Sequence, residues 1–174
     1  EILLAEKLIS LHPWSEMVRF TRSGGEANAV AIRIARAASG KDNIAICGYH
    51  GWHDWYLSSN ITNKKSLDQH LMNNTPIAGV PKSLKNTVFP FEYNNFQQLR
   101  AIVENKNIGT IKMEVKRNHE PTNNFLKKVR KLATDKNIVL IFDECTSGFR
   151  QTFGGLHKFY DVNPDIAIFG KALG

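Results

Sequence analysis

The sequence predicts an α/β fold in which helices cover a mostly parallel β-sheet. Short apolar segments alternate along the chain with helical patterns or long polar crossovers, the order expected of a parallel sheet. The strongest strand candidate, residues 138–142, is apolar at every position, as expected of a strand covered on both faces. Polar residues follow several of these segments, and parallel sheets bind ligands beyond the carboxyl ends of their strands. We therefore expect function at that edge of the sheet.

Each element is predicted from the spacing of its apolar residues. Helices are predicted where apolar residues recur at helical spacing, and strands where short apolar runs end at turn residues. The predicted helices are residues 1–11, 27–38, 96–104 and 125–133. The predicted strands are residues 17–20, 44–47, 87–89, 109–115, 138–142 and 166–169. Residues 60–85 are polar, contain two prolines, and are predicted as a long loop.

Length and composition predict one globular domain with a sizeable core, since the chain has 174 residues, 42% of them hydrophobic and 22% charged. No apolar run is long enough to cross a bilayer. The chain starts at Glu1 without the basic and then apolar pattern of a secretory signal, so we interpret residues 1–174 as the inner part of a longer protein. Cys47 and Cys145 lie at the ends of apolar runs and are expected to be reduced, which favours a cytoplasmic location.

The net charge of +7 raises the question of nucleic-acid binding. The lysines are spread along the chain, and no arginine-rich run or aromatic-basic pattern of a nucleic-acid module occurs. A phosphorylated ligand, or acidic segments outside this chain, explains the charge more simply, so we expect no nucleic-acid partner. Retention on DNA that falls steeply with salt would favour the alternative.

A turn of small residues precedes the second predicted helix. Ser23 is followed three residues later by Glu26, the spacing of a capping box, with Gly24 and Gly25 between them. Strand, small turn and helix start together offer free backbone N–H groups and the positive end of the helix dipole to an anion. The same pattern is also typical of an ordinary capped helix, and both interpretations stay open at this point.

Aromatic residues crowd the segment that follows the strand predicted at residues 44–47. In this segment, residues 48–56, Tyr49 stands just beyond the strand end, where a flat ring can stack on a flat ligand. His50, His53 and Asp54 also suggest a zinc site. Because no further ligand at a suitable spacing is obvious, the stacking interpretation is favoured.

Two charged residues mark the ends of the last two predicted strands. Asp143 follows the run 138–142, and Lys171 follows the run 166–169 after Gly170. Burial disfavours the charged form of a lysine and makes its amine a nucleophile, as a Schiff-base lysine requires. The alternative is a surface lysine at a strand end. Agreement of the Ser23 turn with Asp143 and Lys171 on one sheet edge favours the catalytic interpretation.

Five segments occur in the order of a known family. They are Ser23-Gly24-Gly25-Glu26-Ala27, Tyr49-His50-Gly51, Phe142-Asp143-Glu144-Cys145-Thr146-Ser147-Gly148-Phe149-Arg150, Pro164-Asp165 and Gly170-Lys171. With them the sequence resembles the class III aminotransferases, which use pyridoxal 5′-phosphate (PLP), and most closely the glutamate-1-semialdehyde aminomutase type. The resemblance spans nearly the whole chain. It implies a fold type I large domain with α/β/α layers.

The resemblance also implies roles for individual residues. Lys171 would carry the PLP aldehyde as a Schiff base, and its free amine would later serve as the base for a 1,3-proton shift. Asp143 would pair with the pyridine nitrogen through a charge-assisted hydrogen bond, making the ring an electron sink. Tyr49 would stack on one ring face, Cys145 would lie against the other, and His50 belongs to the same cofactor-binding set.

The phosphate of the cofactor would be held by Ser23, Gly24 and Gly25, and Glu114 would lie beside the cofactor. Two departures from the family stand out. Gly25 occupies a position where many relatives have serine or threonine, so one hydroxyl donor is missing. Relatives usually have proline after the glutamate at position 114, whereas this chain has valine and then the unusual residues 116–119.

The family's remaining parts lie outside this stretch. Residues 1–174 would form part of a PLP-binding large domain, without the N-terminal segment, the last strand and the C-terminal small domain, and we expect no activity from them alone. The resemblance implies a homodimer acting on small amino donors and acceptors. Aminotransferase and aminomutase remain alternatives. A non-catalytic phosphate- or nucleotide-binding module is a further one, and it would have no use for Lys171 or Asp143.

Overall fold

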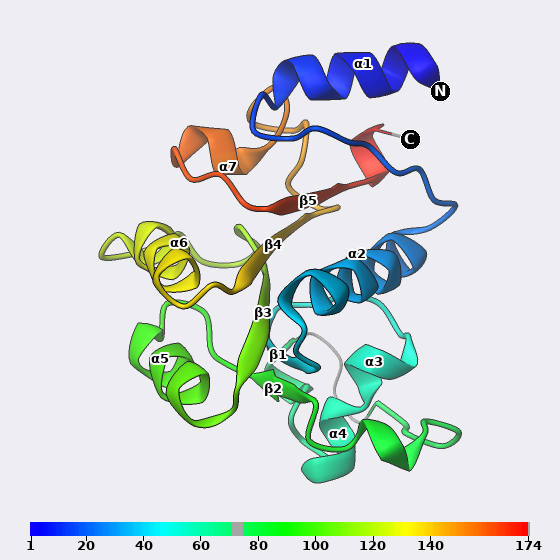
Figure 1. Cartoon of the computed structure of the whole chain (residues 1–174), viewed down its shortest axis with the longest axis vertical. Helices are drawn as coiled ribbons and strands as arrows, with labels where there is room; N and C mark the ends of the chain where they lie inside the picture. Colours follow the sequence, from blue (N-terminus) through cyan, green and yellow to red (C-terminus); the bar gives the residue numbers. More distant parts are fainter. Residues whose placement is uncertain (71–74, 174) are drawn as a thin grey trace.

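The computed structural model describes residues 1–70 and 75–173 and contains one parallel sheet (Figure 1). Its strands lie in the order β2-β1-β3-β4-β5, and every neighbouring pair is parallel. The strands are β1 (Asn43–Cys47), β2 (Val88–Pro90), β3 (Ile108–Glu114), β4 (Val139–Glu144) and β5 (Ile166–Phe169). The parallel sheet predicted from the sequence is therefore confirmed.

Helices cover both faces of this sheet. The helices are α1 (Ile2–Leu11), α2 (Gly24–Ser39), α3 (Asp54–Leu57), α4 (Ser59–Thr62), α5 (Phe96–Asn105), α6 (Phe125–Asp135) and α7 (Leu156–Phe159). Short 3₁₀ turns span Asp68–His70, Lys82–Leu84 and Lys171–Leu173. In Figure 1, α5 and α6 lie on one side of the strands and α2 and α3 on the other. Within the described ranges, every helix is too short or too polar to traverse a bilayer.

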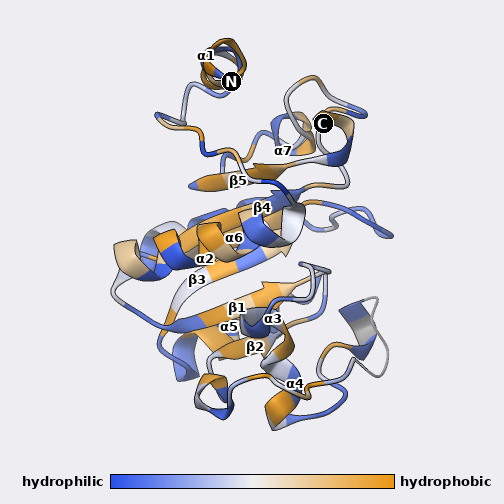
Figure 2. Cartoon of the chain, turned by 90° about the vertical axis from the view of Figure 1, so that its right-hand side faces the viewer, coloured by the Kyte–Doolittle hydropathy of each residue, from blue (hydrophilic) through white to orange (hydrophobic). Residues whose placement is uncertain are grey.

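Two apolar clusters form the core, one on each face of the sheet, and Figure 2 shows the hydrophobic strands between the helices. Phe142 packs in the cluster that includes α5 and α6, whereas Ile141 packs in the cluster that includes α2. Because successive side chains of a strand point to opposite faces, Asp143 lies on the same face as Ile141 and α2. The strand pattern thus delivers the Asp143 carboxylate to the α2 side of the sheet.

Helix α2 begins and ends as the sequence predicts. The Ser23 hydroxyl oxygen accepts the Glu26 backbone N–H at 3.2 Å, and Gly40 ends the helix in the left-handed conformation with φ 65°. The reciprocal half of the capping box differs, because the Glu26 carboxylate accepts the N–H of Arg22 instead of that of Ser23. Ser23 therefore caps the helix as expected, but the Glu26 carboxylate binds the backbone N–H of the residue before Ser23.

Two other expectations are corrected. Residues 17–20 form no strand: the segment is extended, but no neighbouring strand pairs with it, and Met17 is 83% exposed. The Ser23 turn consequently follows an irregular segment. Residues 60–85 are not one continuous loop, since α4 overlaps their start and two 3₁₀ turns interrupt them. The part of that prediction covering residues 71–74 lies outside the described residues.

Candidate functional site

The segments singled out in the sequence meet at the carboxyl edge of the sheet. A Cβ atom placed on Gly24 would lie 3.2 Å from Cys145 Sγ, and one placed on Gly170 would lie 3.4 Å from the same sulfur. A Cβ atom on Gly51 would lie 3.3 Å from the Cα of Gly25. The start of α2, the loop after β1 and the ends of β4 and β5 are therefore in contact.

Asp143 is the centre of this region. It is buried near the end of β4, in register with Ile168 of β5. Its Oδ2 atom accepts two hydrogen bonds, from His50 Nδ1–H at 2.9 Å and from Lys112 Nζ at 3.3 Å. Its Oδ1 atom accepts the backbone N–H of Cys145 at 3.1 Å. Three donors from three segments thus hold the carboxylate in one orientation.

The charges of these groups follow from their burial and proximity. Burial raises the pKa of the Asp143 carboxyl, but the Lys112 charge and the His50 hydrogen bond outweigh this effect and hold the pKa well below its usual value. Burial and the Lys112 charge lower the pKa of His50 to about 4, although Asp143 opposes the change. At pH 7 Asp143 is therefore ionised and His50 is neutral, with its proton on Nδ1 toward the carboxylate.

Lys112 was missed by the sequence analysis. It lies at the middle of β3, between Ile46 of β1 and Ile141 of β4 in the sheet register, and it is 0% exposed. Burial lowers the pKa of its ammonium, against the attraction of Asp143. The available signal was a lysine inside a predicted strand of mostly apolar residues, because a charge buried there needs a partner.

Glu114 ends β3 in register with Asp143, and it contacts Tyr49 in the loop after β1. The buried Glu114 carboxylate accepts the Tyr49 N–H at 3.1 Å and receives the Nε–H of Arg117 at 2.8 and 2.9 Å. Burial raises the pKa of Glu114, while Arg117 opposes the rise. The Arg117 guanidinium carbon lies 5.8 Å from the centre of the Tyr49 ring. Sequence analysis flagged residues 116–119 as unusual but did not foresee this ion pair.

A cavity of about 340 Å³ adjoins Tyr49. Its lining residues include Glu114, Arg117, His70 and Tyr93. The cavity therefore brings together both signs of charge and two aromatic rings at the carboxyl edge of β1 and β3.

Lys171 is exposed in this structure, so the expectation of a buried lysine is wrong here. It begins the last 3₁₀ turn with φ 51°, and its Nζ donates to the Thr146 hydroxyl oxygen at 2.9 Å. Thr146 also receives Arg117 Nη2 at 3.5 Å. Between Lys171 and Asp143, the described residues show no hydrogen bond or ion pair. The two residues share one sheet edge because β4 and β5 are neighbours.

His53 occupies the space beside the glycine turn. A Cβ atom on Gly25 would lie 2.7 Å from His53 Cε1, so a larger residue at position 25 would displace the imidazole. The buried Nδ1 atom of His53 has no hydrogen-bond partner among residues 1–70 and 75–173. Glycine at position 25 thus leaves room for the His53 ring, where a serine or threonine would collide with it. The turn also gains a nitrogen that can bind an anion.

The zinc interpretation of His50, His53 and Asp54 finds no support in the geometry. His50 is bonded to Asp143, while His53 packs on Gly25. Throughout the part of the chain that the structure describes, no three His, Cys, Asp or Glu side chains are arranged to hold a metal ion.

Comparison with known proteins identifies the family. The family model described as Aminotransferase class-III matches residues 1–174. The chain belongs to the class III aminotransferase family. The resemblance stated from the sequence motifs is therefore confirmed, and the family indicates PLP as the cofactor.

Curated relatives of this class III chain carry two kinds of activity in their names. It is 36% identical to the 3-aminobutyryl-CoA aminotransferase of Cloacimonas acidaminovorans, over 98% of this chain and 39% of that protein. It is also 36% identical to the glutamate-1-semialdehyde 2,1-aminomutase of Methanobrevibacter smithii, over 100% of this chain and 41% of that protein. The chain thus spans about two fifths of the length of these relatives.

A solved structure supports the same fold. The omega-transaminase from Sphaerobacter thermophilus matches with a TM-score of 0.82 and 30% identity, over 98% of this chain and 41% of that chain. The sheet and flanking helices described above are therefore part of a fold type I α/β domain.

Proposed function

We propose that the protein containing this chain transfers an amino group with PLP, as an aminotransferase or an aminomutase. The observation that carries the proposal is the buried, ionised Asp143 carboxylate at the same sheet edge as the glycine turn and Lys171. When bound there, PLP supplies an electron sink for charge that develops on the amino-bearing carbon.

Asp143 binds and orients the ring nitrogen in this proposal. Oδ2 already accepts two hydrogen bonds and Oδ1 accepts one, so Oδ1 offers the freer lone pair to a ring N–H. His50 supports cofactor binding by donating to Asp143 Oδ2, which holds the carboxylate in place. A fixed, ionised acceptor favours the protonated ring, which is the better electron sink.

Lys171 supplies the amine that binds the cofactor aldehyde and that moves a proton at the substrate carbon. Two observations support this role: Lys171 is exposed, so a ligand can reach its amine, and its Nζ is held by the Thr146 hydroxyl. A positioned amine is a suitable general base for the proton shift. Thr146 holds Lys171 Nζ and is the residue best placed to orient it.

The start of α2 binds the phosphate. The first N–H groups of a helix have no partner within the helix and carry the positive end of its dipole. Gly24 and Gly25 let an anion approach closely, and the Ser23 hydroxyl adds a donor. We assign His53 as a further donor, because its unpartnered Nδ1 lies beside Gly25 and replaces the hydroxyl absent from that position.

Tyr49 and Cys145 would contact the two faces of the ring. Glu114 fixes the Tyr49 backbone by accepting its N–H, so it positions the aromatic ring. Cys145 lies between Gly24 and Gly170, and burial raises the pKa of its thiol to about 12, so it acts as a small neutral group.

The wider organisation of the protein is also proposed. We infer that residues 1–174 are part of a PLP-binding large domain and that the protein forms a homodimer in the cytoplasm without a nucleic-acid partner. The chain covers about two fifths of each relative's length, which supports its assignment as part of a larger domain. Cys47 and Cys145 are both free thiols, which supports a reducing compartment.

The experiment uses the natural polypeptide that contains this chain. We expect PLP to bind with a near-visible absorbance band that Lys171→Ala abolishes and that Lys136→Ala, at the opposite edge of the sheet, preserves. Amino transfer is then assayed with a panel of amino donors that includes glutamate 1-semialdehyde and 3-aminobutyryl-CoA, the compounds named in the two relatives. A product with the amino group moved within one molecule identifies an aminomutase.

The competing proposal, a phosphate- or nucleotide-binding module without catalysis, makes an opposite prediction. It needs the Ser23 turn but not Asp143. Phosphate-ligand binding that is unchanged in Asp143→Ala, together with no absorbance band in the unaltered protein, would support that module and overturn amino transfer.

A further inference from the structure

Lys112 is a fully buried lysine in the middle of the sheet. Its strand neighbours in register are Ile46 and Ile141, which belong to the cluster packed against α2. Its Nζ donates to Asp143 Oδ2 at 3.3 Å. Burying an ammonium in such surroundings is costly unless a counter-charge is adjacent, so Asp143 is the reason that this lysine can be charged.

Among residues 1–70 and 75–173, the groups that face Lys112 offer it one unpaired negative charge, that of Asp143. Asp143 faces it from β4 and His50 from the loop after β1, where burial keeps the imidazole neutral at pH 7. The Cys145 thiol, which follows β4, is neutral because burial raises its pKa to about 12. Glu114, two residues further along β3, is already paired with Arg117. Lys112 and Asp143 therefore form a buried pair with no net charge.

A protonated ring nitrogen on Asp143 would add a second cation to this pair. The carboxylate would then face two buried positive charges, which repel each other in a region that excludes water. A lysine can lose its proton when a second positive charge repels it, whereas an arginine cannot. The neutral pair is restored when one of the two nitrogens gives up its proton.

We propose that Lys112 is a positioning residue that keeps Asp143 ionised before the cofactor binds and gives up its own proton when a cationic ring nitrogen binds the same carboxylate. The Nζ–H bond breaks, and the proton leaves to solvent when the ring nitrogen arrives protonated or passes to that nitrogen when it arrives neutral. In both cases the neutral Lys112 amine still donates to Oδ2. The inference rests on the proposed function, since it assumes that PLP binds at Asp143.

Calorimetry of PLP binding tests this coupling. The natural polypeptide, stripped of cofactor, is titrated with PLP at pH 8 in buffers of different ionisation enthalpy, which gives the number of protons exchanged. We expect the unaltered protein to release about one proton more than Lys112→Met, because only a titratable group at position 112 contributes that proton. Lys136→Met is the matched control and should give the same proton count as the unaltered protein.

A second titration needs no substitution and covers the case in which Lys112→Met does not fold. A PLP analogue with a carbon in place of the ring nitrogen keeps the aldehyde and phosphate but presents no cation to Asp143. Relative to the ring-protonated cofactor, its binding to the unaltered protein should leave the Lys112 proton in place, so that the proton count at pH 6, where the free cofactor ring is protonated, falls by about one.

The outcomes separate the two proposals. Equal proton counts for the unaltered protein and Lys112→Met, or for PLP and the analogue where the variant does not fold, overturn the Lys112 inference while PLP binding stands. Failure of PLP to bind the unaltered protein overturns the proposed function and the inference together.

Discussion

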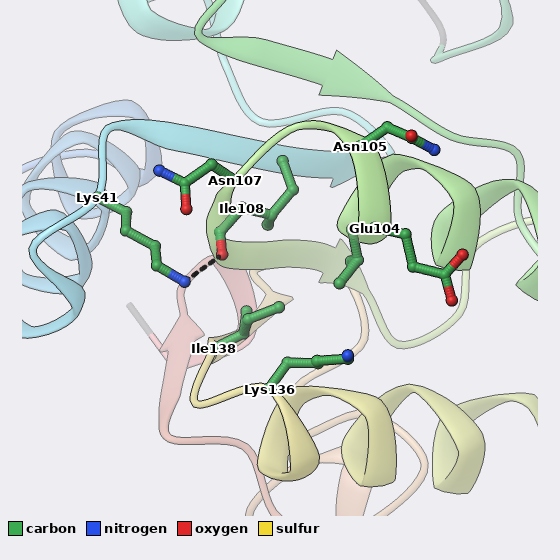
Figure 3. Close-up of a pocket in the computed structure, with 8 residues that line it drawn as sticks. Lys41, Glu104, Asn105, Asn107, Ile108, Lys136 and Ile138 are labelled. Carbon is green, nitrogen blue, oxygen red and sulfur yellow. Dashed lines mark hydrogen bonds between the residues drawn. The ribbon is translucent and has the colours of Figure 1, made fainter.

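At the carboxyl edge of the sheet, Lys112 and Asp143 are buried and satisfy each other, whereas at the amino edge Lys136 and Glu104 are exposed to solvent. A cavity of about 330 Å³ lies at this amino edge, and Figure 3 shows its lining residues around Ile108 and Ile138. Its size matches the cavity of about 340 Å³ beside Tyr49. Cavity size therefore does not distinguish the two edges, whereas buried and paired charge favours the carboxyl edge as the proposed site.

The amino edge is built from local turn chemistry. Helices α5 and α6 are each followed by a C-cap lysine and then by an asparagine with positive φ, Asn107 and Asn137. Asparagine adopts this conformation more readily than most residues. Lys41 Nζ donates to the Ile108 carbonyl oxygen at 3.4 Å, the dashed contact in Figure 3. The two asparagine turns join helix to strand through neighbouring residues, whereas the Lys41 contact comes from a position 67 residues away.

Asp143→Ala is expected to lower stability far more than a substitution at the amino edge. The substitution leaves the Lys112 ammonium buried without its counter-charge, which we expect to cost about 3–5 kcal/mol of stability. Hydrogen exchange of the β3 and β4 amides in the natural polypeptide measures this loss. Lys136→Met should change stability by less than about 0.5 kcal/mol.

A double variant sharpens the same comparison. Asp143→Leu combined with Lys112→Met replaces the buried pair with apolar groups, and it should recover most of the stability lost in Asp143→Ala. If the double variant is as unstable as the single one, the loss does not come from the unpaired lysine.

The next largest effect is a pH dependence of folding stability, which arises from histidines at the carboxyl edge. The pKa of His50 is lowered to about 4 in the folded chain, so the unfolded chain binds its proton more readily between pH 6.5 and 4. The stability contributed by neutral His50 is complete above about pH 6.5 and falls by about 3 kcal/mol as the pH drops to 4. Burial also lowers the pKa of His70, which adds a slope of the same sign.

His50→Asn isolates the His50 contribution. Asparagine keeps an N–H donor near the position of Nδ1 but cannot take up a proton in this range. We expect a shallower stability–pH curve for the variant than for the unaltered protein between pH 6.5 and 4. Curves of equal slope would show that His50 is not the group responsible.

The smallest of the expected effects concerns the glycine turn. A methyl group at position 25 would collide with the His53 ring, so Gly25→Ala should weaken PLP binding by about 1–3 kcal/mol. In a His53→Ala background the collision is removed, and the same substitution should cost about 1 kcal/mol less. PLP dissociation constants of the four proteins measure the coupling, and additive effects would show that His53 does not fill this space.

Local patterns were enough to predict most of the fold. The apolar run of β4 and the Gly40 end of α2 depend on residues within a few positions of each other, so periodicity and cap chemistry reveal them. Residues 17–20 have the same kind of pattern but no neighbouring strand. A sequence pattern cannot report whether a pairing partner is present, which is why that strand prediction was wrong.

The site was only partly predictable because its contacts are long-range. The pairing of Asp143 with Lys112 joins positions 31 residues apart, and that with His50 joins positions 93 apart. Their positions after predicted strand ends placed Asp143, Tyr49 and the Ser23 turn at one edge, and the family motifs assigned their roles. They gave no sign of the Lys112 ammonium, whose role appears only when β3 and β4 are aligned.

The account depends most on Lys171 acting as the base at the substrate carbon in a site organised by Asp143. Deuterium incorporation from heavy water at the amino-bearing carbon of a substrate found in the donor panel measures that step directly. We predict incorporation by the unaltered protein and a loss of at least about a hundredfold in Lys171→Ala, with Lys136→Ala unaffected. Incorporation at an undiminished rate in Lys171→Ala would contradict the account.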